Sequence, residues 1–194
     1  MAVPVISELA RRVSKRLRVI SPAMAVLFVG SIFSAYAQQS FVVSANIQIE
    51  SGDTWIQANT KYRLYGVQSC LRGTEFKTAS DTYDCGLVSL AQFAALTQIA
   101  TITCQPVAPA NDGAIFVICA TKLAEASVSN PNATIDVGTA LIASGYAFAA
   151  VDRKGAPVNA NYLVSELVSK KNRSGLWAGE FVHPVQYLLN GAKH

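Results

Sequence analysis

Four cysteines constrain the fold of this 194-residue chain more than any other feature. They are Cys70, Cys85, Cys104 and Cys119, and the spacing within the first two equals the spacing within the last two. Four cysteines allow three disulfide connectivities, of which pairing in sequence order closes the shortest loops and is favoured by chain entropy. Each such bridge would stabilise the fold by about 3 kcal/mol. We therefore predict the disulfides Cys70–Cys85 and Cys104–Cys119.

A metal site or a cysteine nucleophile would be the competing use of these thiols. Zinc sites normally contain more closely spaced ligands, such as CxxC, and a nucleophilic cysteine needs a histidine to activate it. The chain has no CxxC pair, and its two histidines are His183 and the C-terminal His194. Structural disulfides are therefore the preferred interpretation.

Residues 1–37 have the pattern of a signal peptide. Five basic residues lie between Arg11 and Arg18, an apolar run follows from Val19 to Phe33, and Ala35-Tyr36-Ala37 offers small residues to a signal peptidase. The apolar run is short for a membrane-spanning helix, which needs about 20 residues. We predict export to the periplasm or the extracellular space. The alternative is an uncleaved N-terminal segment that anchors the protein in the inner membrane.

The net charge of the chain resides in this predicted export segment. The whole sequence has 16 Lys and Arg against 12 Asp and Glu, a formal charge of +4. Five of the basic residues and one acidic residue precede Gln38, so residues 38–194 have 11 of each and no net charge. A neutral domain has no overall field that attracts a polyanion, so we expect nucleic acid to bind weakly or not at all.

Hydrophobic patterning within residues 38–194 predicts one α+β domain. Alternating or β-branched runs predict strands at 41–49, 54–56, 62–67, 99–107 and 114–120, and helical spacing predicts a helix at 87–99. Two further helices are expected, a short one at 136–144 that ends at Gly145 and a longer one at 159–173 whose basic end suits a helix C-terminus. A turn around Ala58-Asn59-Thr60-Lys61 separates the second and third strands.

Several short motifs occur in an order that resembles the thermonuclease, or staphylococcal-nuclease-like, family in its secreted proteobacterial form. These motifs are Gly52-Asp53-Thr54, Arg63-Leu64-Tyr65-Gly66-Val67, Gln68-Ser69-Cys70, Cys85-Gly86, Tyr162 through Glu166, and Gly175 through Phe181. The resemblance implies that residues 38–194 form a mainly β, five-stranded OB-fold barrel with about three packed helices.

The residues that this family uses for catalysis are mostly missing. Its active members follow the Arg-Leu-x-Gly-Ile strand with Asp-Ala-Pro-Glu. In this chain either Gln68 and Leu71 occupy the two carboxylate positions or the whole run is deleted, and both alignments lose both acids. A second phosphate-binding arginine is replaced by Ile115. Of the site residues that the resemblance implies, two remain: Asp53 as a vestigial Ca²⁺ ligand and Arg63 as a vestigial catalytic residue.

Other acidic residues could restore the site by lying close to Asp53 in the fold. Glu75, Asp81 and Asp84 are the candidates, although loop acids beside a disulfide are more often solvated. For Arg63 we expect a structural ion pair with Asp53.

Three further side-chain groups have functional and structural interpretations. The aromatic residues Trp55, Tyr62 and Tyr65 could stack on bases but more commonly pack a barrel. We expect Trp177 to dock the last helix and His183 to lie on the surface.

The resemblance, taken with these losses, predicts an exported nuclease-like protein without catalytic activity. It would act as a binding or accessory module for an envelope protein or polymer, for example in exopolysaccharide production, would need no cofactor, and would meet a membrane only through an uncleaved N-terminal segment. The alternative is a Ca²⁺-dependent phosphodiesterase that cleaves DNA and RNA with a rearranged site around Asp53 and Arg63. A third hypothesis, nucleic-acid binding without cleavage, requires a local basic patch.

Overall fold

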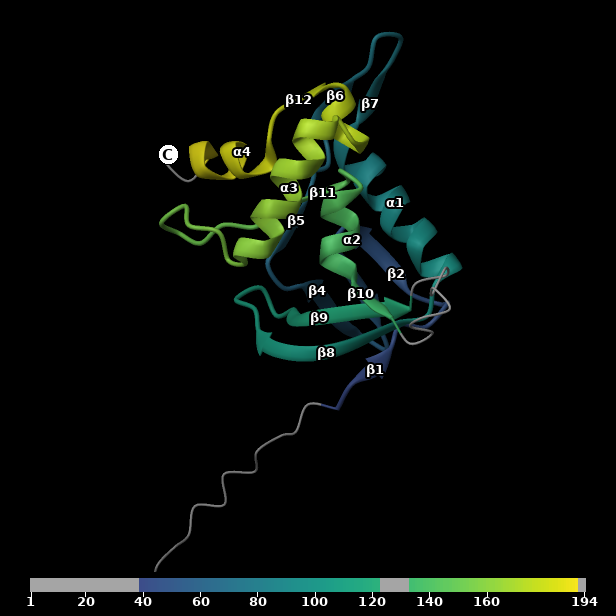
Figure 1. Ribbon diagram of the computed structural model, residues 1–194. Helices are drawn as coiled ribbons and strands as arrows, with labels where there is room; N and C mark the ends of the chain where they lie inside the picture. The colour runs from purple at the N-terminus through teal and green to yellow at the C-terminus, as the bar shows by residue number, and fades with distance from the viewer. Residues whose placement is uncertain (1–38, 123–132, 192–194) are drawn as a thin grey trace, which may run out of the picture. The chain divides into compact units, whose positions relative to one another are not determined.

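Short strands and four α-helices form the described part of the chain (Figure 1). The computed structural model describes residues 39–122 and 133–191, so the predicted export segment lies outside the described residues. The elements are β1 (Phe41–Val42), β2 (Gln48–Ser51), β3 (Thr54–Gln57), β4 (Thr60–Leu64), β5 (Val67–Ser69), β6 (Glu75–Lys77), β7 (Thr82–Asp84), α1 (Cys85–Ile99), β8 (Ile102–Pro109), β9 (Ile115–Lys122), β10 (Thr134–Asp136), α2 (Val137–Ala143), β11 (Ala147–Ala149), α3 (Ala160–Asn172), the 3₁₀ helix η1 (Gly175–Ala178), β12 (Glu180–Phe181) and α4 (Pro184–Gly191).

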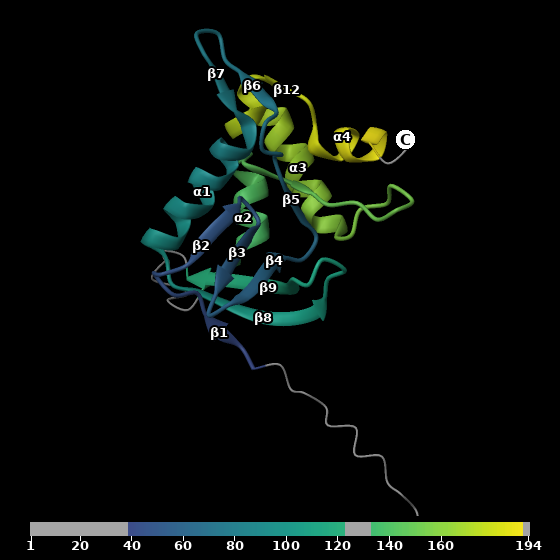
Figure 2. The ribbon, with the colours of Figure 1, turned by 180° about the vertical axis from the view of Figure 1, so that it is seen from behind.

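The main sheet is curled like part of a barrel, as Figures 1 and 2 show from opposite sides. Its strands lie in the order β1-β8-β9-β4-β3-β2, and β10 pairs with β9. The neighbouring strands run antiparallel except β4 and β9, which run parallel. A parallel pair requires a long crossover, and the chain supplies it through β5, α1 and β8. The result is a barrel-like α+β fold.

Backbone conformation explains where the first strands turn and end. Ala58 and Asn59 both have positive φ, 48° and 62°, between β3 and β4. Two such residues make the tight hairpin turn whose twist matches that of its strands, so the predicted turn is confirmed. The expected strand 62–67 is instead divided, because Gly66 has φ 73° and separates β4 from β5.

The main hydrophobic core lies between the curled sheet and the helices α1 and α2. Trp55, Phe93, Val117 and Leu141 are among its fully buried side chains, at 2 % exposure or less. They come from β3, α1, β9 and α2 in turn. Helix α1 begins at Cys85, two residues before the predicted start, because the Asp84 carboxylate accepts a hydrogen bond from the N–H of Leu87 and caps the helix.

Both predicted disulfides are confirmed. Cys104 and Cys119 face each other across the β8–β9 ladder, and Cys70–Cys85 joins the end of β5 to the first residue of α1. Since disulfides persist in oxidising compartments, they indicate an exported protein. Among the described residues, none of the helices is long and apolar enough to cross a membrane.

The shortest elements differ from what the sequence pattern predicts. The predicted strand 41–49 is divided into β1 and β2, and the expected helices 136–144 and 159–173 are α2 and α3. Strands β6 and β7, the late strands β10 to β12 and the C-terminal helix α4 were not predicted. Four helices are therefore present in the described chain, where about three were expected.

Candidate functional site

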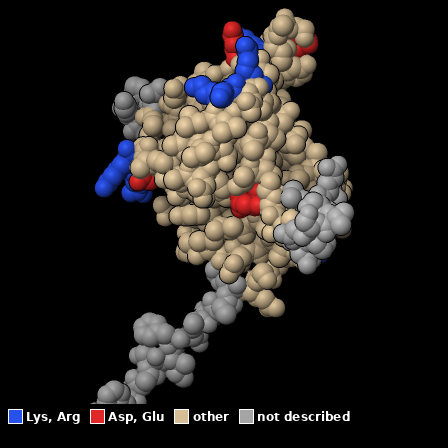
Figure 3. Space-filling model, viewed as in Figure 1, with Lys and Arg blue, Asp and Glu red and all other residues tan. Residues whose placement is uncertain are grey.

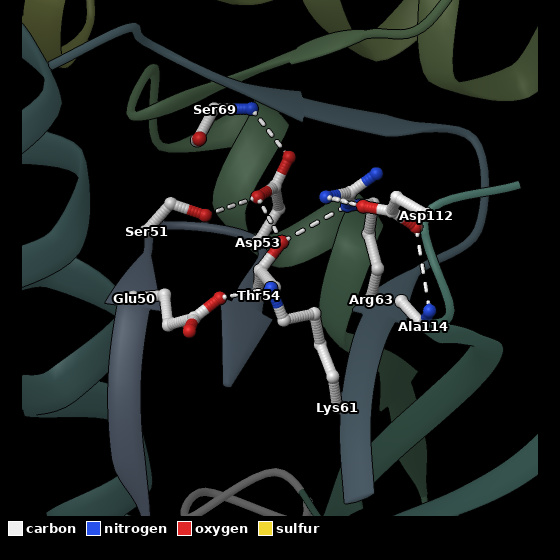
Figure 4. Close-up of polar contacts among 9 residues, drawn as sticks. All are labelled: Glu50, Ser51, Asp53, Thr54, Lys61, Arg63, Ser69, Asp112 and Ala114. Atoms are coloured by element: carbon white, nitrogen blue, oxygen red, sulfur yellow. Dashed lines mark hydrogen bonds and ion pairs between the residues drawn. The ribbon is translucent and has the colours of Figure 1, made fainter. Parts of the chain in front are cut away.

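Asp53 and Arg63 lie near each other at one end of the main sheet (Figure 4). Asp53 occupies the turn between β2 and β3, and Arg63 lies on β4 opposite Thr54. The turn presses against α1, because a Cβ atom on Gly52 would lie 2.8 Å from the Ser89 Cβ. Glycine is thus required for this close approach, and it holds Asp53 in place.

The Asp53 carboxylate is buried and accepts three hydrogen bonds from within the protein. Its exposed fraction is 5 %. One carboxylate oxygen accepts hydrogen bonds from the hydroxyls of Ser51 and Thr54, the latter at 2.8 Å, and the other accepts one from the Ser69 N–H at 3.0 Å. These contacts tie the β2–β3 turn to β5. The observed role of Asp53 is therefore structural.

Arg63 pairs with Asp112 instead of Asp53, contrary to expectation. Its guanidinium donates to the Asp112 carboxylate at 2.8 Å and to the Thr54 hydroxyl at 3.1 Å. The Thr54 hydroxyl in turn donates to Asp53, so the arginine reaches that carboxylate only through Thr54. Asp112 comes from the β8–β9 hairpin, 49 residues along the chain.

The electrostatics of Asp112 favour its charged form. Partial burial raises the pKa of Asp112, but the hydrogen bond from the Ala114 N–H and the positive charge of Arg63 outweigh it, so that its pKa lies below the ordinary value. The charge of Arg63 is consequently matched by a carboxylate that stays ionised at neutral pH.

A shallow pocket of about 300 Å³ lies over Asp53. Its wall contains Arg63, Gln68, Leu71, Arg72 and Leu188. A neighbouring pocket of about 410 Å³ shares Gln68 and Leu188 with it and extends to Arg153. These two adjoining pockets are called the groove below, and Gln68 and Leu71 line the part of it that contains Asp53.

The three acids that could have restored the site have other roles. Asp84 caps α1 and accepts a hydrogen bond from the Gly73 N–H, and Glu75 forms an ion pair with Lys77. Asp81 lies in the β6–β7 turn, where its carboxylate accepts a hydrogen bond from the Ser80 hydroxyl. None of them is among the residues that line the pocket with Asp53. Within the described residues no three His, Cys, Asp or Glu side chains are grouped so that they could hold a metal ion.

The aromatic residues considered for base stacking pack against other rings. Trp55 is fully buried, Tyr62 lies against Phe41 with ring centroids 4.5 Å apart, and Tyr65 meets Phe116 edge-on at 5.7 Å. Ile115, where the resemblance leads us to expect a second arginine, packs against the core. These contacts identify the aromatic groups as packing residues.

His183 was expected on the surface, and this prediction is wrong. Its Nε2 lies 3.0 Å from the Glu166 carboxylate, and its Nδ1 faces the Val185 N–H at 3.3 Å. The ring also packs edge-on against Phe148. Trp177 packs against Phe148 and Phe181, and Lys170 of α3 lies over its ring, 5.3 Å from the centroid. No sequence signal linked His183 to Glu166, because the partners lie on different elements.

Comparison with known proteins adds no assignment: no family model matches this chain, and no curated protein matches it.

Proposed function

We propose that this protein is an exported thermonuclease-like protein of OB-fold type that binds an envelope polymer or protein and does not cleave phosphodiesters. The observation that carries the proposal is the state of Asp53, whose carboxylate oxygens already accept three hydrogen bonds from the protein itself. A Ca²⁺ ion takes six to eight oxygen ligands. A carboxylate whose oxygens already accept hydrogen bonds from the protein is therefore poorly suited to be a Ca²⁺ ligand.

The rest of the pocket supports the same conclusion. Gln68 and Leu71 line the wall with Asp53, and neither can ionise to act as a base or as a hard-cation ligand. Arg63 is neutralised by Asp112, so a phosphate would have to compete with a carboxylate already bound. Each of these changes removes a contribution worth orders of magnitude in rate.

The groove itself supports a binding role. Its two joined pockets, of about 300 and 410 Å³, offer polar groups from Gln68, Arg72 and Arg153 and an apolar wall from Leu188 and Leu189. An extended polymer with hydrogen-bonding groups would fit this mixture better than a compact ion. The OB-fold assignment gains support from the curled antiparallel sheet with its single parallel pair, β4–β9.

A nuclease assay on the oxidised protein tests the proposal. Denatured DNA and RNA would be incubated with the protein, with Ca²⁺ and with chelator, beside an Arg63→Ala variant. We expect no cleavage above the buffer control, and no heat of Ca²⁺ binding by calorimetry. Ca²⁺-dependent cleavage that the Arg63→Ala substitution abolishes would establish the alternative, a phosphodiesterase with a rearranged site.

A binding titration then separates the remaining possibilities. Single-stranded oligonucleotides and acidic or neutral exopolysaccharide fragments would be titrated at two salt concentrations. Oligonucleotide binding that weakens steeply with salt would instead favour nucleic-acid recognition without cleavage. Saturable binding of the polysaccharide, weakened by Gln68→Ala in the groove, is the expected result.

A further inference from the structure

Helix α3 buries polar side chains and exposes aliphatic ones, which is the reverse of an ordinary surface helix. The side chains that it buries are those of Tyr162, Glu166 and Ser169. All three have polar groups: Glu166 has a carboxylate, and Tyr162 and Ser169 have hydroxyls. Four aliphatic side chains point outward instead, with exposed fractions of 36 % for Leu163, 60 % for Val164, 57 % for Leu167 and 50 % for Val168. A helix at a protein surface normally has the opposite arrangement.

Polar contacts of Glu166 hold the helix in this orientation. Its carboxylate accepts a hydrogen bond from the Ala149 N–H of β11 at 2.6 Å and pairs with His183 at 3.0 Å. Burial and, secondarily, the Asp136 carboxylate raise the pKa of Tyr162, so this residue stays neutral inside. Because successive residues turn by about 100°, burying these positions forces Val164 and Leu167 to the opposite side.

The exposed aliphatic face continues into a basic end. Val164, Leu167, Val168 and Lys171 follow the i, i+3, i+4, i+7 spacing of a single helix face. Lys170 and Arg173 flank Lys171, and no ion pair joins any of these three to a carboxylate of the described chain. Figure 3 shows the molecule from the side where α3 lies, largely free of charged side chains, with basic groups gathered where the helix ends.

A second copy of the chain does not complement this face. An antiparallel pair of α3 helices would place each basic end beside the first turn of its partner, which has no acidic residue. A parallel pair would bring two sets of Lys170, Lys171 and Arg173 together, which repel. Charge complementarity therefore requires an anionic partner.

The position of Lys171 favours a lipid surface over an acidic protein. Lysine is depleted in the cores of protein–protein interfaces, where aromatic residues are enriched, yet here it continues the aliphatic stripe. At a bilayer, by contrast, a lysine stem lies among apolar side chains while its ammonium reaches the phosphates. Aliphatic residues on one helix face with lysines alongside are typical of helices that lie in the membrane interface.

We propose that the outer face of α3 docks on an anionic phospholipid bilayer. Leu163, Val164, Leu167 and Val168 enter the boundary between headgroups and acyl chains, while the basic residues at the helix end contact the lipid phosphates. The docking is independent of the N-terminal segment and leaves the groove over Asp53 on another part of the molecule. It goes beyond the proposed function by placing the binding module on the membrane surface.

Vesicle co-sedimentation of the full-length oxidised protein tests this proposal. The vesicles would be pure phosphatidylcholine or a mixture with about one third phosphatidylglycerol, as a bilayer carrying negative charge. We expect binding to the mixed vesicles that weakens on the order of a hundredfold when Lys170, Lys171 and Arg173 are all changed to Gln, since each positive charge near the surface contributes about fivefold. Leu167→Glu should weaken binding to a comparable degree.

The matched control is Ile118→Glu, which places the same charge at a side chain 47 % exposed on β9. This variant should bind as the unchanged protein does, and circular dichroism would establish that all variants are folded. The proposal would be overturned if the protein bound both vesicle types equally and the α3 variants did not change that binding. It would also be overturned if the protein bound neither vesicle type. A dimer in light scattering that Leu167→Glu converts to a monomer would show that a second copy covers the face instead.

Discussion

At the scale of single residues, Asp53 is a buried carboxylate that joins separate segments of the chain. Its carboxylate receives the hydroxyls of Ser51 and Thr54 and the N–H of Ser69, so it joins the β2–β3 turn to β5. Hydrogen bonds to a charged acceptor are stronger than neutral ones, and a buried donor left without its acceptor is costly. The residue is thus explained without any metal.

Substitution of Asp53 should therefore destabilise the fold. Asp53→Ala would leave the buried Ser69 N–H without its acceptor, and we expect a loss of about 2–3 kcal/mol in the free energy of unfolding. Urea denaturation measures this loss. Glu50→Ala, which removes only a partly exposed ion pair with Lys61, should change stability by less than about 1 kcal/mol. If Asp53→Ala proved as stable as the unchanged protein, the structural role would be wrong.

At the scale of elements, side-chain carboxylates decide where the helices begin and which way they face. Asp84 caps α1 by accepting from the Leu87 N–H at 2.8 Å, and Asp136 caps α2 in the same way through the Thr139 N–H at 2.7 Å. Glu166 orients α3 through its contact with β11. In each case one acid satisfies a backbone donor that would otherwise have no partner.

The Asp84 cap should give stability a dependence on acid pH. Partial burial raises the pKa of Asp84, but hydrogen bonds from the Gly73 and Leu87 N–H groups and the charge of Arg72 outweigh it and lower the pKa below its ordinary value. Because the folded pKa is depressed, the stabilisation is complete above the unfolded pKa of about 4 and is lost as the pH falls through the folded value.

Asp84→Asn keeps a capping oxygen but cannot titrate, so its unfolding free energy should vary less between pH 5 and pH 2 than that of the unchanged protein. Asp84→Ala should lose about 1 kcal/mol at neutral pH. Urea unfolding curves across this pH range provide the measurement. An equally steep acid dependence in Asp84→Asn would assign the effect to other carboxylates.

Helix α4 should depend on the Glu166–His183 contact. His183→Ala removes the side chain that pairs with Glu166 at 3.0 Å and packs against Phe148, just before α4 begins. We expect the backbone amide hydrogens of α4 after Pro184 to exchange at least tenfold faster, since local opening is easier where few contacts remain. Exchange in α1 should be unchanged, and uniform acceleration in both helices would mean global destabilisation instead.

At the scale of the whole molecule, two hydrophobic clusters are each held by one disulfide. Cys104–Cys119 lies in the main core with Trp55 and Phe93, and Cys70–Cys85 lies in the smaller cluster around Phe148 and Leu176. Both close loops with a sequence separation of 15. The chain-entropy model therefore assigns the two bridges equal contributions of about 3 kcal/mol.

Paired Cys→Ala substitutions test this equivalence. Each double variant should lose about 3 kcal/mol in the free energy of unfolding, and the quadruple variant about twice as much, because the bridges lie in separate clusters. Guanidinium unfolding of the three variants measures the losses. A quadruple loss far from the sum would show that the clusters are energetically coupled.

The sequence by itself determined the features that depend on residues close together in the chain. Pairing of cysteines with short loops, the tight turn at Ala58-Asn59 and the helical spacing of α1 all arise from local geometry, and the sequence predicts each of them. The mixed α+β class follows from these elements. Interactions over a few residues need no knowledge of the rest of the fold.

Only the tertiary structure decided which distant side chains meet. Arg63 finds Asp112 and His183 finds Glu166 because the sheet and the C-terminal elements bring separate strands and helices together. Three-residue strands such as β5 and β11 are too short to leave a periodic signal and exist because a partner pairs with them. The spacing of the aliphatic residues alone predicts that Leu163 and Leu167 face inward. The structure has them facing outward, because Glu166 is buried with hydrogen-bonding partners on β11 and at His183. A buried carboxylate needs such partners, so their positions determine the orientation of the helix.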